Sequence, residues 1–393
     1  MHTDPIVIVE AKRTVIGTFQ GALKDFKAPD LGALAIKGCL ENLKELEESV
    51  DEVIMGCVLT AGLGQAPARQ SVIKAGLRNN IPATTVNKVC GSGMRSIILA
   101  HDLIKAGSAK CIIAGGMESM TNAPYLSDKA RAGLRMGHAK LTDHMFFDGL
   151  EDAYESGTLM GHYAEKTATK YGLSRQMQDT FALKSYERAK QAMDNGHFAN
   201  QMTPVLVDKE GKLIDKDEPI LNAKPEKIPQ LKPAFAPDGT VTAANASGIS
   251  DGAAALVLMP LSLANKLGLR PRAKIVGHAQ YSHEPQWFTT APIGAIRSLT
   301  QKVGWEISDV DLWEINEAFA VVTLAAIQEL KLDPLKVNIH GGACALGHPI
   351  GATGARLVVS LLNALELNGL KRGIASPCIG GGEATAIAIE VMD

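Results

Sequence analysis

The feature that most constrains the fold of this chain is an order of elements that occurs twice. Extended residues 84–89 lead into a glycine-rich turn with the sequence CGSG at residues 90–93, and a helix follows that is apolar on nearly all sides. Towards the C-terminus, extended residues 337–340 precede the glycine-rich residues 347–354 and a second strongly apolar helix. A helix without a polar face must be covered on every side, so both helices are expected in the centre of the molecule. We therefore predict two divergent βα halves, each with a glycine-rich turn at the N-terminus of a buried helix.

Buried helices that lie between sheets predict a layered fold of the α/β class. We expect five layers in the order α/β/α/β/α, with mixed sheets. The N-terminal half is assigned to residues 1–118 and 251–270, and the C-terminal half to residues 271–393. Residues 119–250 interrupt the repeat, because they are polar, rich in methionine and rich in turns. This stretch is predicted to form an inserted domain over the active site.

Net charge and apolar runs exclude some classes of partner. The 393 residues include 40 basic and 42 acidic side chains, for a formal net charge of −2. This balance provides no general attraction for nucleic acid or for an anionic membrane. No apolar run approaches the length that spans a bilayer, and the N-terminal residues do not have the pattern of a targeting segment. The cytoplasm is therefore the expected location.

The six cysteines do not have the pattern of a disulfide framework. They show no Cys-x-x-Cys pair and no zinc-type cluster with histidine, so no metal site is predicted. A free cysteine is most often a small buried hydrophobic residue. Only Cys90 and Cys378 have surroundings that suggest more than this.

Cys90 lies where an extended segment turns into a buried helix. A helix N-terminus exposes free N–H groups and partial positive charge, which lower the pKa of a thiol. Gly91 and Gly93 allow a substrate to approach the backbone closely, and the nearby N–H groups are donors for an oxyanion. On this motif alone, a buried structural cysteine beside a tight turn is an equal alternative.

His348 lies in the corresponding turn of the second half. A lone histidine beside a proline is more often a structural residue in a turn. If a pseudo-twofold axis relates the halves, however, both turns converge on one point. A Cys–His pair at that point is the usual arrangement for activating a nucleophile.

Two further segments carry polar or reactive side chains. Cys378 precedes three glycines, which leave the backbone N–H groups around Gly380 accessible to a ligand. The segment fits a glycine-rich turn between strands, and it also fits a second thiol that acts as an acid–base group. Asn316, in the sequence NEAF, fits a helix cap, and it also fits an amide that orients a water molecule or a carbonyl group.

Together these segments resemble the thiolase family, and the similarity extends from residue 6 to the C-terminus. The sequences CGSG, NEAF, GHPxGxxG and CxGGG occur in this order and are jointly specific, although each alone is weak. The resemblance implies a thiolase-like fold of two repeats with an inserted loop domain that binds coenzyme A (CoA) and takes part in oligomerisation. It also implies acyl-CoA substrates and no cofactor, with CoA as substrate or product.

The resemblance implies catalytic roles for five residues. Cys90 attacks an acyl-CoA thioester while His348 takes its proton, and Cys378 removes a proton from the methyl group of a second acetyl-CoA. The resulting enolate attacks the acyl-enzyme, and thiolysis is the reverse reaction. One oxyanion hole consists of His348 and a water held by Asn316, and the other of the N–H groups of Cys90 and Gly380.

Six further positions are implied as substrate-binding residues by the same resemblance. Those expected along the pantetheine arm of CoA are Phe235, Ala243 and Ser247. Those expected around the rest of the substrate are Ala318 and the acyl-pocket residues Met160 and Phe319.

Residues 131–143 are similar to the loop through which biosynthetic-type thiolases form tetramers. A homotetramer is therefore expected, and acetoacetyl-CoA synthesis is favoured. Two positions depart from the biosynthetic pattern. Leu159 stands where these members usually have histidine, and Leu221-Asn222 lies near the usual position of an arginine that holds the CoA nucleotide. Three lysines are candidates to replace that arginine: Lys224, Lys227 and Lys232.

The predicted reaction is the reversible Claisen condensation of two acetyl-CoA to acetoacetyl-CoA and CoA, by a ping-pong mechanism through an acyl-cysteine. The nearest alternative is a degradative 3-ketoacyl-CoA thiolase of fatty-acid β-oxidation, which shares the chemistry but accepts longer chains. A decarboxylating ketoacyl synthase is disfavoured, because that relative has a second histidine where Asn316 stands. An inactive CoA or lipid carrier on the same fold is disfavoured, because all four catalytic side chains are present.

Overall fold

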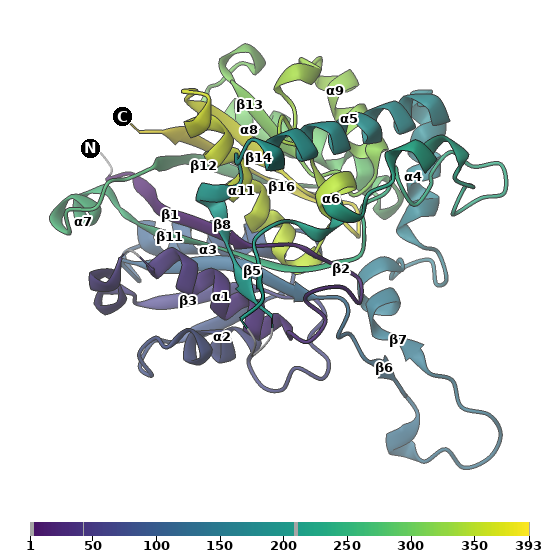
Figure 1. The fold of residues 1–393 in the computed structure, drawn as a ribbon, viewed down its shortest axis with the longest axis horizontal. Coiled ribbons are helices and arrows are strands. Elements are labelled where there is room, and N and C mark those ends of the chain that lie inside the picture. The colour runs from purple at the N-terminus through teal and green to yellow at the C-terminus, as the bar shows by residue number, and fades with distance from the viewer. Residues whose placement is uncertain (1–3, 42, 208–210, 393) are drawn as a thin grey trace.

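Two half-sheets form the frame of the computed structural model, which describes residues 4–41, 43–207 and 211–392 (Figure 1). In spatial order, the N-terminal half-sheet contains β4 (Ala83–Val86), β3 (Glu52–Gly56), β5 (Ile112–Ser119), β11 (Ser250–Pro260) and β1 (Ile6–Thr14). The C-terminal half-sheet contains β12 (Ala273–Ser282), β16 (Glu383–Val391), β14 (Arg372–Ser376) and β13 (Leu312–Ile315).

The half-sheets are joined where β1 pairs antiparallel with β12 through Val7–Lys274 and Ile8–Ala273. In each half the outer strands are parallel: β3 runs parallel to β4 and β5, and β13 runs parallel to β14. The strands nearer the junction are antiparallel. Where the first half has β4, the second has a single parallel bridge from Trp313 to Val337. The prediction of two related halves with mixed sheets is therefore confirmed.

Helices cover the outer faces of the half-sheets and fill the space between them. α1 (Ala28–Leu40) and α2 (Pro67–Ala75) share one hydrophobic cluster with the N-terminal half-sheet, on the lower side of Figure 1. α3 (Ser92–Lys105) and α11 (Ile350–Leu367) lie side by side between the half-sheets in a second cluster. α8 (Ala291–Val303) and α9 (Ala320–Leu330) form a third cluster with the C-terminal half-sheet. The five expected layers are therefore present.

α11 shows how the layering follows from the sequence. The expectation that no apolar run approaches the length of a membrane span is wrong for α11, which among the described residues is the one helix long and apolar enough to cross a membrane. In this molecule, however, 89% of it is buried. α3 and strands of both half-sheets enclose it. Its apolar surface therefore belongs to the core, as expected of a helix without a polar face.

Glycines allow the N-terminal ends of α3 and α11 to touch backbone to backbone. A Cβ atom added at Gly93 would lie 2.8 Å from the backbone nitrogen of Ala355. A Cβ atom added at Gly354 would overlap the backbone of Met94. No other residue permits approaches this close, because every other side chain begins with a Cβ atom. The two turns that precede these helices are thereby held close together.

The inserted stretch contains one long helix. This helix is α5 (Arg175–Asp194), and the hydroxyl oxygen of Ser174 caps it by accepting the N–H of Met177 at 3.2 Å. α5 packs against α9 and against α10 (Ala343–Leu346), and thus against the C-terminal half.

The inserted stretch is also fastened to the N-terminal half. β8 (Met202–Thr203) pairs in parallel with β1. Arg13 on β1 donates two hydrogen bonds of 2.8 Å to the carboxylate of Asp217, and both side chains are fully buried. The stretch thus packs against both halves, and the division of the chain into three parts stays a prediction.

A hairpin of β6 (Tyr125–Leu126) and β7 (Thr142–Asp143) projects from the body of the molecule at the lower right of Figure 1. Its loop is exposed, including the apolar side chains of Met136, which is 98% exposed, and Leu141, which is 69% exposed. This hairpin coincides with the expected tetramerisation loop.

Short elements complete the chain. The remaining strands are β2 (Gly17–Thr18), β9 (Val205–Leu206), β10 (Leu213–Ile214) and β15 (Cys378–Ile379). The remaining α-helices are α4 (Met160–Tyr171), α6 (Glu218–Asn222) and α7 (Leu261–Lys266). The short helical turns are η1 (Lys44–Ser49), η2 (Ala130–Ala132), η3 (Phe146–Leu150), η4 (Ala199–Gln201), η5 (Pro225–Gln230), η6 (Pro285–Thr290), η7 (Ile307–Asp309) and η8 (Pro334–Lys336).

Candidate active site

A cavity of about 510 Å³ is lined by residues of both halves and of the inserted stretch. Three of the five expected catalytic residues and all six expected substrate-binding residues line it. They are Cys90, His348 and Gly380, and Met160, Phe235, Ala243, Ser247, Ala318 and Phe319. The other two catalytic candidates, Cys378 and Asn316, do not belong to this lining and are fully buried.

A strained turn presents Cys90 at the end of the cavity. Val89, immediately before it, has a φ of 45°, in the left-handed region that costs a β-branched residue about 1–3 kcal/mol. The side-chain oxygen of Asn87 accepts the N–H of Val89 at 2.9 Å and so stabilises the turn. The hydroxyl of Ser92, the first residue of α3, donates to the carbonyl of Val89 at 2.7 Å. The nucleophile candidate is thus held by its backbone, at the start of a buried helix.

The thiol of Cys90 is a neutral group in this environment. Burial raises its pKa to about 11, and the negative charge of Glu118 adds to this. Hydrogen bonds from the backbone N–H groups of Gly380 and of Cys90 itself act in the opposite direction. The sequence predicted that the helix N-terminus lowers the pKa of Cys90. Backbone N–H groups do lower it, but desolvation has the larger effect, so the net shift is upward and the predicted direction is wrong.

His348 has one nitrogen fixed and the other free. Its Nδ1 lies 2.6 Å from the hydroxyl of Thr353, and that hydroxyl donates its only proton to the carbonyl of Pro349 at 3.0 Å. Nδ1 must therefore carry the ring proton, and the lone pair is on Nε2. This Nε2 is buried without a hydrogen-bond partner among the residues that the structure describes. Burial, with a contribution from the charge of Arg356, lowers the pKa of His348 to about 3, so the ring is a neutral base.

Cys378 is fully buried near Cys90. It begins β15, and the glycines that follow form a tight turn in which Gly381 and Gly382 have φ of 93° and 86°. Burial raises the pKa of Cys378 well above its usual range, and the neighbouring Cys90 raises it further. A Cβ atom at Gly91 would overlap Ile379, so glycine is required for the two turns to pack together. The expected second thiol is therefore close to the first.

The side-chain amide of Asn316 is buried beside Arg356. Asn316 follows β13, and its side-chain oxygen accepts a hydrogen bond of 3.3 Å from the guanidinium of Arg356. Its Nδ2 is buried and has no acceptor within the described part of the chain. Because unpaired buried donors are uncommon, this N–H₂ group is available for a water molecule or a substrate oxygen.

Arg356 is itself part of a buried charge network. It is 2% exposed, and its guanidinium lies 3.6 Å from a carboxylate oxygen of Glu314. Burial raises the pKa of Glu314 to about 8, although the charge of Arg356 opposes the shift. The arginine therefore fixes one face of the Asn316 amide and supplies the positive charge that disfavours protonation of His348.

Glu118 is a buried carboxyl group that the sequence analysis does not single out. Its oxygens accept the N–H groups of Val58 at 3.0 Å, Leu59 at 3.1 Å and Gly351 at 2.8 Å. Burial raises its pKa to about 7, although these hydrogen bonds oppose the shift. The signal available in the sequence was an acidic residue in the otherwise apolar strand β5. Through these hydrogen bonds Glu118 fastens the start of α11 to the N-terminal half.

The outer part of the cavity is apolar and aromatic. The rings of Phe235 and Phe319 meet edge to face with centroids 6.0 Å apart, and Phe288 and Phe319 do so at 6.5 Å. Gly161 at the start of α4 has no room for a Cβ atom, because the ring of Phe235 fills that space. Several lining residues had no recognisable signal in the sequence: Phe146, Leu150, Phe288 and Ile350.

A second, smaller cavity of about 320 Å³ carries two of the three candidate lysines. Lys224 and Lys227 line it, whereas Lys232 does not. It shares Ala243 and Gly248 with the main cavity, so the two spaces are neighbours. A ligand with an apolar arm in the main cavity and an anionic group beyond it would meet these lysines.

Comparisons with known proteins agree with this arrangement. The chain matches two family models: thiolase, N-terminal domain, over residues 6–262, and thiolase, C-terminal domain, over residues 269–391. A protein of Chromobacterium violaceum called acetyl-CoA acetyltransferase is 49% identical over 389 residues, which are 98% of this chain and 99% of that protein.

Solved structures match along the whole chain. The acetyl-CoA acetyltransferase of Bacillus anthracis has a TM-score of 0.96 and 39% identity, with 99% of each chain covered. The Acat5 thiolase of Ascaris suum, in complex with coenzyme A, has a TM-score of 0.93 and 41% identity, with 99% of this chain and 100% of that chain covered. The predicted fold is therefore confirmed.

Proposed function

This chain belongs to the thiolase family, and on that premise we propose that it catalyses the reversible Claisen condensation of two acetyl-CoA to acetoacetyl-CoA and CoA. It is an acyltransferase. The single observation that carries the proposed mechanism is that Cys90 and His348, whose Nε2 has no hydrogen-bond partner among the described residues, line one cavity, and that the buried Cys378 lies near Cys90.

In the first half-reaction, Cys90 transfers its proton to Nε2 of His348. Its sulfur attacks the thioester carbonyl of acetyl-CoA, so that a new C–S bond forms and the bond to the CoA sulfur breaks. The proton on His348 then passes to the departing CoA sulfur, and acetyl-Cys90 is left. A base that is neutral at rest and faces the thiol is suited to this transfer, because it can accept and return the proton.

In the second half-reaction, Cys378 gives its thiol proton to Nε2 of His348, and the resulting thiolate removes a proton from the methyl group of a second acetyl-CoA. The enolate carbon attacks the carbonyl of acetyl-Cys90, and the bond to the Cys90 sulfur breaks. His348 then returns its proton to the Cys90 thiolate, while Cys378 keeps the proton taken from the substrate, so both thiols are restored and acetoacetyl-CoA is released. The thioester itself acidifies the α-carbon, so no cofactor is required beyond CoA as substrate and product.

Negative charge develops on a thioester oxygen in both half-reactions. We assign one oxyanion hole to the backbone N–H groups of Cys90 and Gly380. We assign the other to Nε2–H of His348 together with a water molecule held by Nδ2 of Asn316. Donors fixed before the reaction stabilise the transition state more than mobile ones do, and both sets are held by the backbone or by buried side chains.

The first test is thiolysis of 3-ketoacyl-CoAs of increasing chain length, followed at the thioester absorbance. We expect acetoacetyl-CoA to be cleaved best, and Cys90→Ala to be inactive with every substrate. Cys111→Ala is the matched control, because Cys111 is a fully buried cysteine outside the cavity lining. Full activity of Cys90→Ala would rule out the nucleophile, whatever the chain length.

One observation favours a second candidate, the degradative 3-ketoacyl-CoA thiolase. Leu159 lines the cavity at the position where biosynthetic relatives are expected to have histidine, and an apolar residue there suits a longer acyl chain. In that case longer substrates should be cleaved faster than acetoacetyl-CoA. Leu159→His should then shift the preference towards acetoacetyl-CoA.

We infer a homotetramer, formed as a dimer of dimers, from the exposed hairpin of β6 and β7. Apolar side chains as exposed as Met136 and Leu141 are suited to burial against another subunit. Light scattering should give the mass of a tetramer for the wild type and of a dimer for Met136→Asp. We also propose a cytoplasmic location, which cell fractionation would test.

A further inference from the structure

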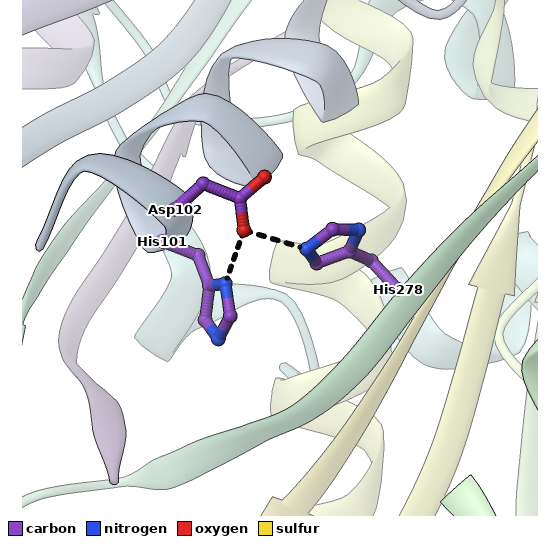
Figure 2. Close-up of side chains that lie close together, drawn as sticks. All are labelled: His101, Asp102 and His278. Carbon is purple, nitrogen blue, oxygen red and sulfur yellow. Dashed lines mark hydrogen bonds and ion pairs between the residues drawn. The ribbon is translucent and has the colours of Figure 1, made fainter. Parts of the chain in front are cut away.

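Figure 2 shows that the side chains of His101, Asp102 and His278 lie close together. None of the three lines the main cavity. His101 and Asp102 lie in the last two turns of α3, roughly 15 Å along the helix from its N-terminal end. His278 lies on β12, the first strand of the C-terminal half-sheet. The cluster therefore joins the central helix of one half to a strand of the other.

One carboxylate oxygen connects the two imidazoles. Oδ1 of Asp102 lies 2.9 Å from Nδ1 of His101 and 2.9 Å from Nε2 of His278. The two rings stand edge to face, with centroids 5.1 Å apart and an interplanar angle of 81°. All three ligand atoms lie within 4.8 Å of one another, and no other group of three such side chains in the described part of the chain meets that limit.

We propose that His101, Asp102 and His278 bind a divalent transition-metal ion of the Zn²⁺ type, with water completing the coordination. Two imidazoles and a carboxylate suit zinc, cobalt or nickel, whereas magnesium and calcium prefer oxygen ligands alone. In a tetrahedral zinc site with bonds of about 2.1 Å, ligand atoms are about 3.4 Å apart. The two nitrogen–oxygen distances of 2.9 Å must widen towards that value, and the two nitrogens, which lie within 4.8 Å of each other, must take up the same spacing when the ion binds.

Burial and access also fit an ion taken up from solution. The side chains of His101 and His278 are 9% and 15% exposed, whereas that of Asp102 is 50% exposed. The two nearly buried imidazoles would thus bind the ion from the protein side, and its other side would remain open to water. A site of this kind is structural, because it lies away from the substrate cavity.

Two lysines lie near enough to the cluster for their charges to act on it: Lys302 on both histidines and Lys105 on His101. These lysines repel a cation, and the carboxylate of Asp102 offsets part of that repulsion.

The test is titration of the whole, reduced enzyme with Co²⁺, in a preparation without a histidine tag. We expect one Co²⁺ per chain with weak visible bands, and without the strong near-ultraviolet absorption of a cobalt–thiolate bond. Affinity should fall at least about a hundredfold in His278→Ala and in Asp102→Asn, because each loses a ligand. His138→Ala is the matched control and should bind like the wild type, since His138 is an exposed histidine of the β6–β7 loop.

Thiolysis activity and thermal unfolding complete the test. His278→Ala and Asp102→Asn should keep wild-type thiolysis without added metal, which shows that they are folded. Zn²⁺ should raise the unfolding temperature of the wild type and of His138→Ala, but not of the two ligand variants. Unchanged Co²⁺ binding in these variants, or bands of the thiolate type only, would overturn the proposal.

Discussion

The two halves of the molecule place different side chains at equivalent positions. In the N-terminal half, Gly56 on β3 pairs with Gly116 on β5, and Glu118 follows two residues later. In the C-terminal half, Ile315 on β13 pairs with Ser376 on β14, and Cys378 follows two residues later. The strand registers therefore make Glu118 and Cys378 counterparts.

Each of these counterparts reaches into the turn of the opposite half. Glu118 accepts the N–H of Gly351 at the start of α11, and Cys378 lies against Cys90 at the start of α3. The N-terminal half thus contributes the proposed nucleophile and a carboxyl group that fastens the central helix of the other half. The C-terminal half contributes the proposed base, the second thiol and the amide. The comparison shows that equivalent positions in the two halves can differ in role. One half has a structural contact at this position, and the other has a proposed catalytic group.

The largest expected loss of activity is for the two cysteines, whose variants should fail in different half-reactions. Cys90→Ala should lose both condensation and the exchange of labelled CoA into acetyl-CoA, because exchange needs only the acyl-enzyme. Cys378→Ala should keep the exchange and lose condensation by about a thousandfold, the contribution expected of an acid–base group. Loss of exchange in a folded Cys378→Ala would show that the second thiol also serves the first half-reaction.

The next effect concerns the protonation of Cys90. Since burial raises the pKa of Cys90 to about 11, its thiolate fraction should increase about tenfold per pH unit between pH 7 and 10. The rate of iodoacetamide labelling, followed at the Cys90 peptide by mass spectrometry, should rise accordingly. A plateau at neutral pH would instead indicate a thiolate–imidazolium pair with His348.

A smaller effect is expected for the arginine that orients the amide. Arg356→Lys keeps the charge but loses the planar contact to Asn316, so kcat should fall about tenfold with little change in KM. In the Asn316→Ala background, Arg356→Lys should leave kcat almost unchanged, because the arginine acts on kcat by orienting the Asn316 amide. Additive losses in the double variant would assign Arg356 a purely structural role.

The smallest effect on catalysis is expected for Glu118→Gln. This substitution should instead change how the free energy of unfolding depends on pH. Because burial raises the pKa of Glu118 to about 7, the folded state binds its proton more tightly than the unfolded state does. Its contribution to stability is present below about pH 4.5 and is lost as the pH rises to about 7, on the order of 3 kcal/mol. Urea unfolding at several pH values should show this slope in the difference between wild type and Glu118→Gln. A difference independent of pH would contradict it.

The sequence predicted the frame and the placement of the two turns, because both depend on a local pattern that occurs twice. The repeat put Cys90 and His348 at equivalent helix starts, and the structure brings both to one cavity. The role assigned to each catalytic side chain stays a prediction until the variants are measured.

What the sequence did not reveal depends on contacts between distant segments. Glu118 binds the N–H of Gly351, which is 233 positions away, and Asp102 binds His278, which is 176 positions away. The pKa of Cys90 could not be predicted either, since the surroundings that desolvate it come from several segments of the chain. Local patterns reveal helix ends and turns, but burial is a property of the whole fold.

Because α3 and α11 touch backbone to backbone at Gly93 and Gly354, the residues proposed to react are positioned independently of the residues that line the acyl pocket. The spacing of the two turns that carry the proposed nucleophile and the proposed base is set by main-chain atoms, so it does not depend on which side chains fill the rest of the cavity. The walls around Leu159 and Phe319 can therefore drift through successive substitutions while the reaction continues. In evolutionary terms, a chain built this way can change its acyl-chain preference without first losing its activity.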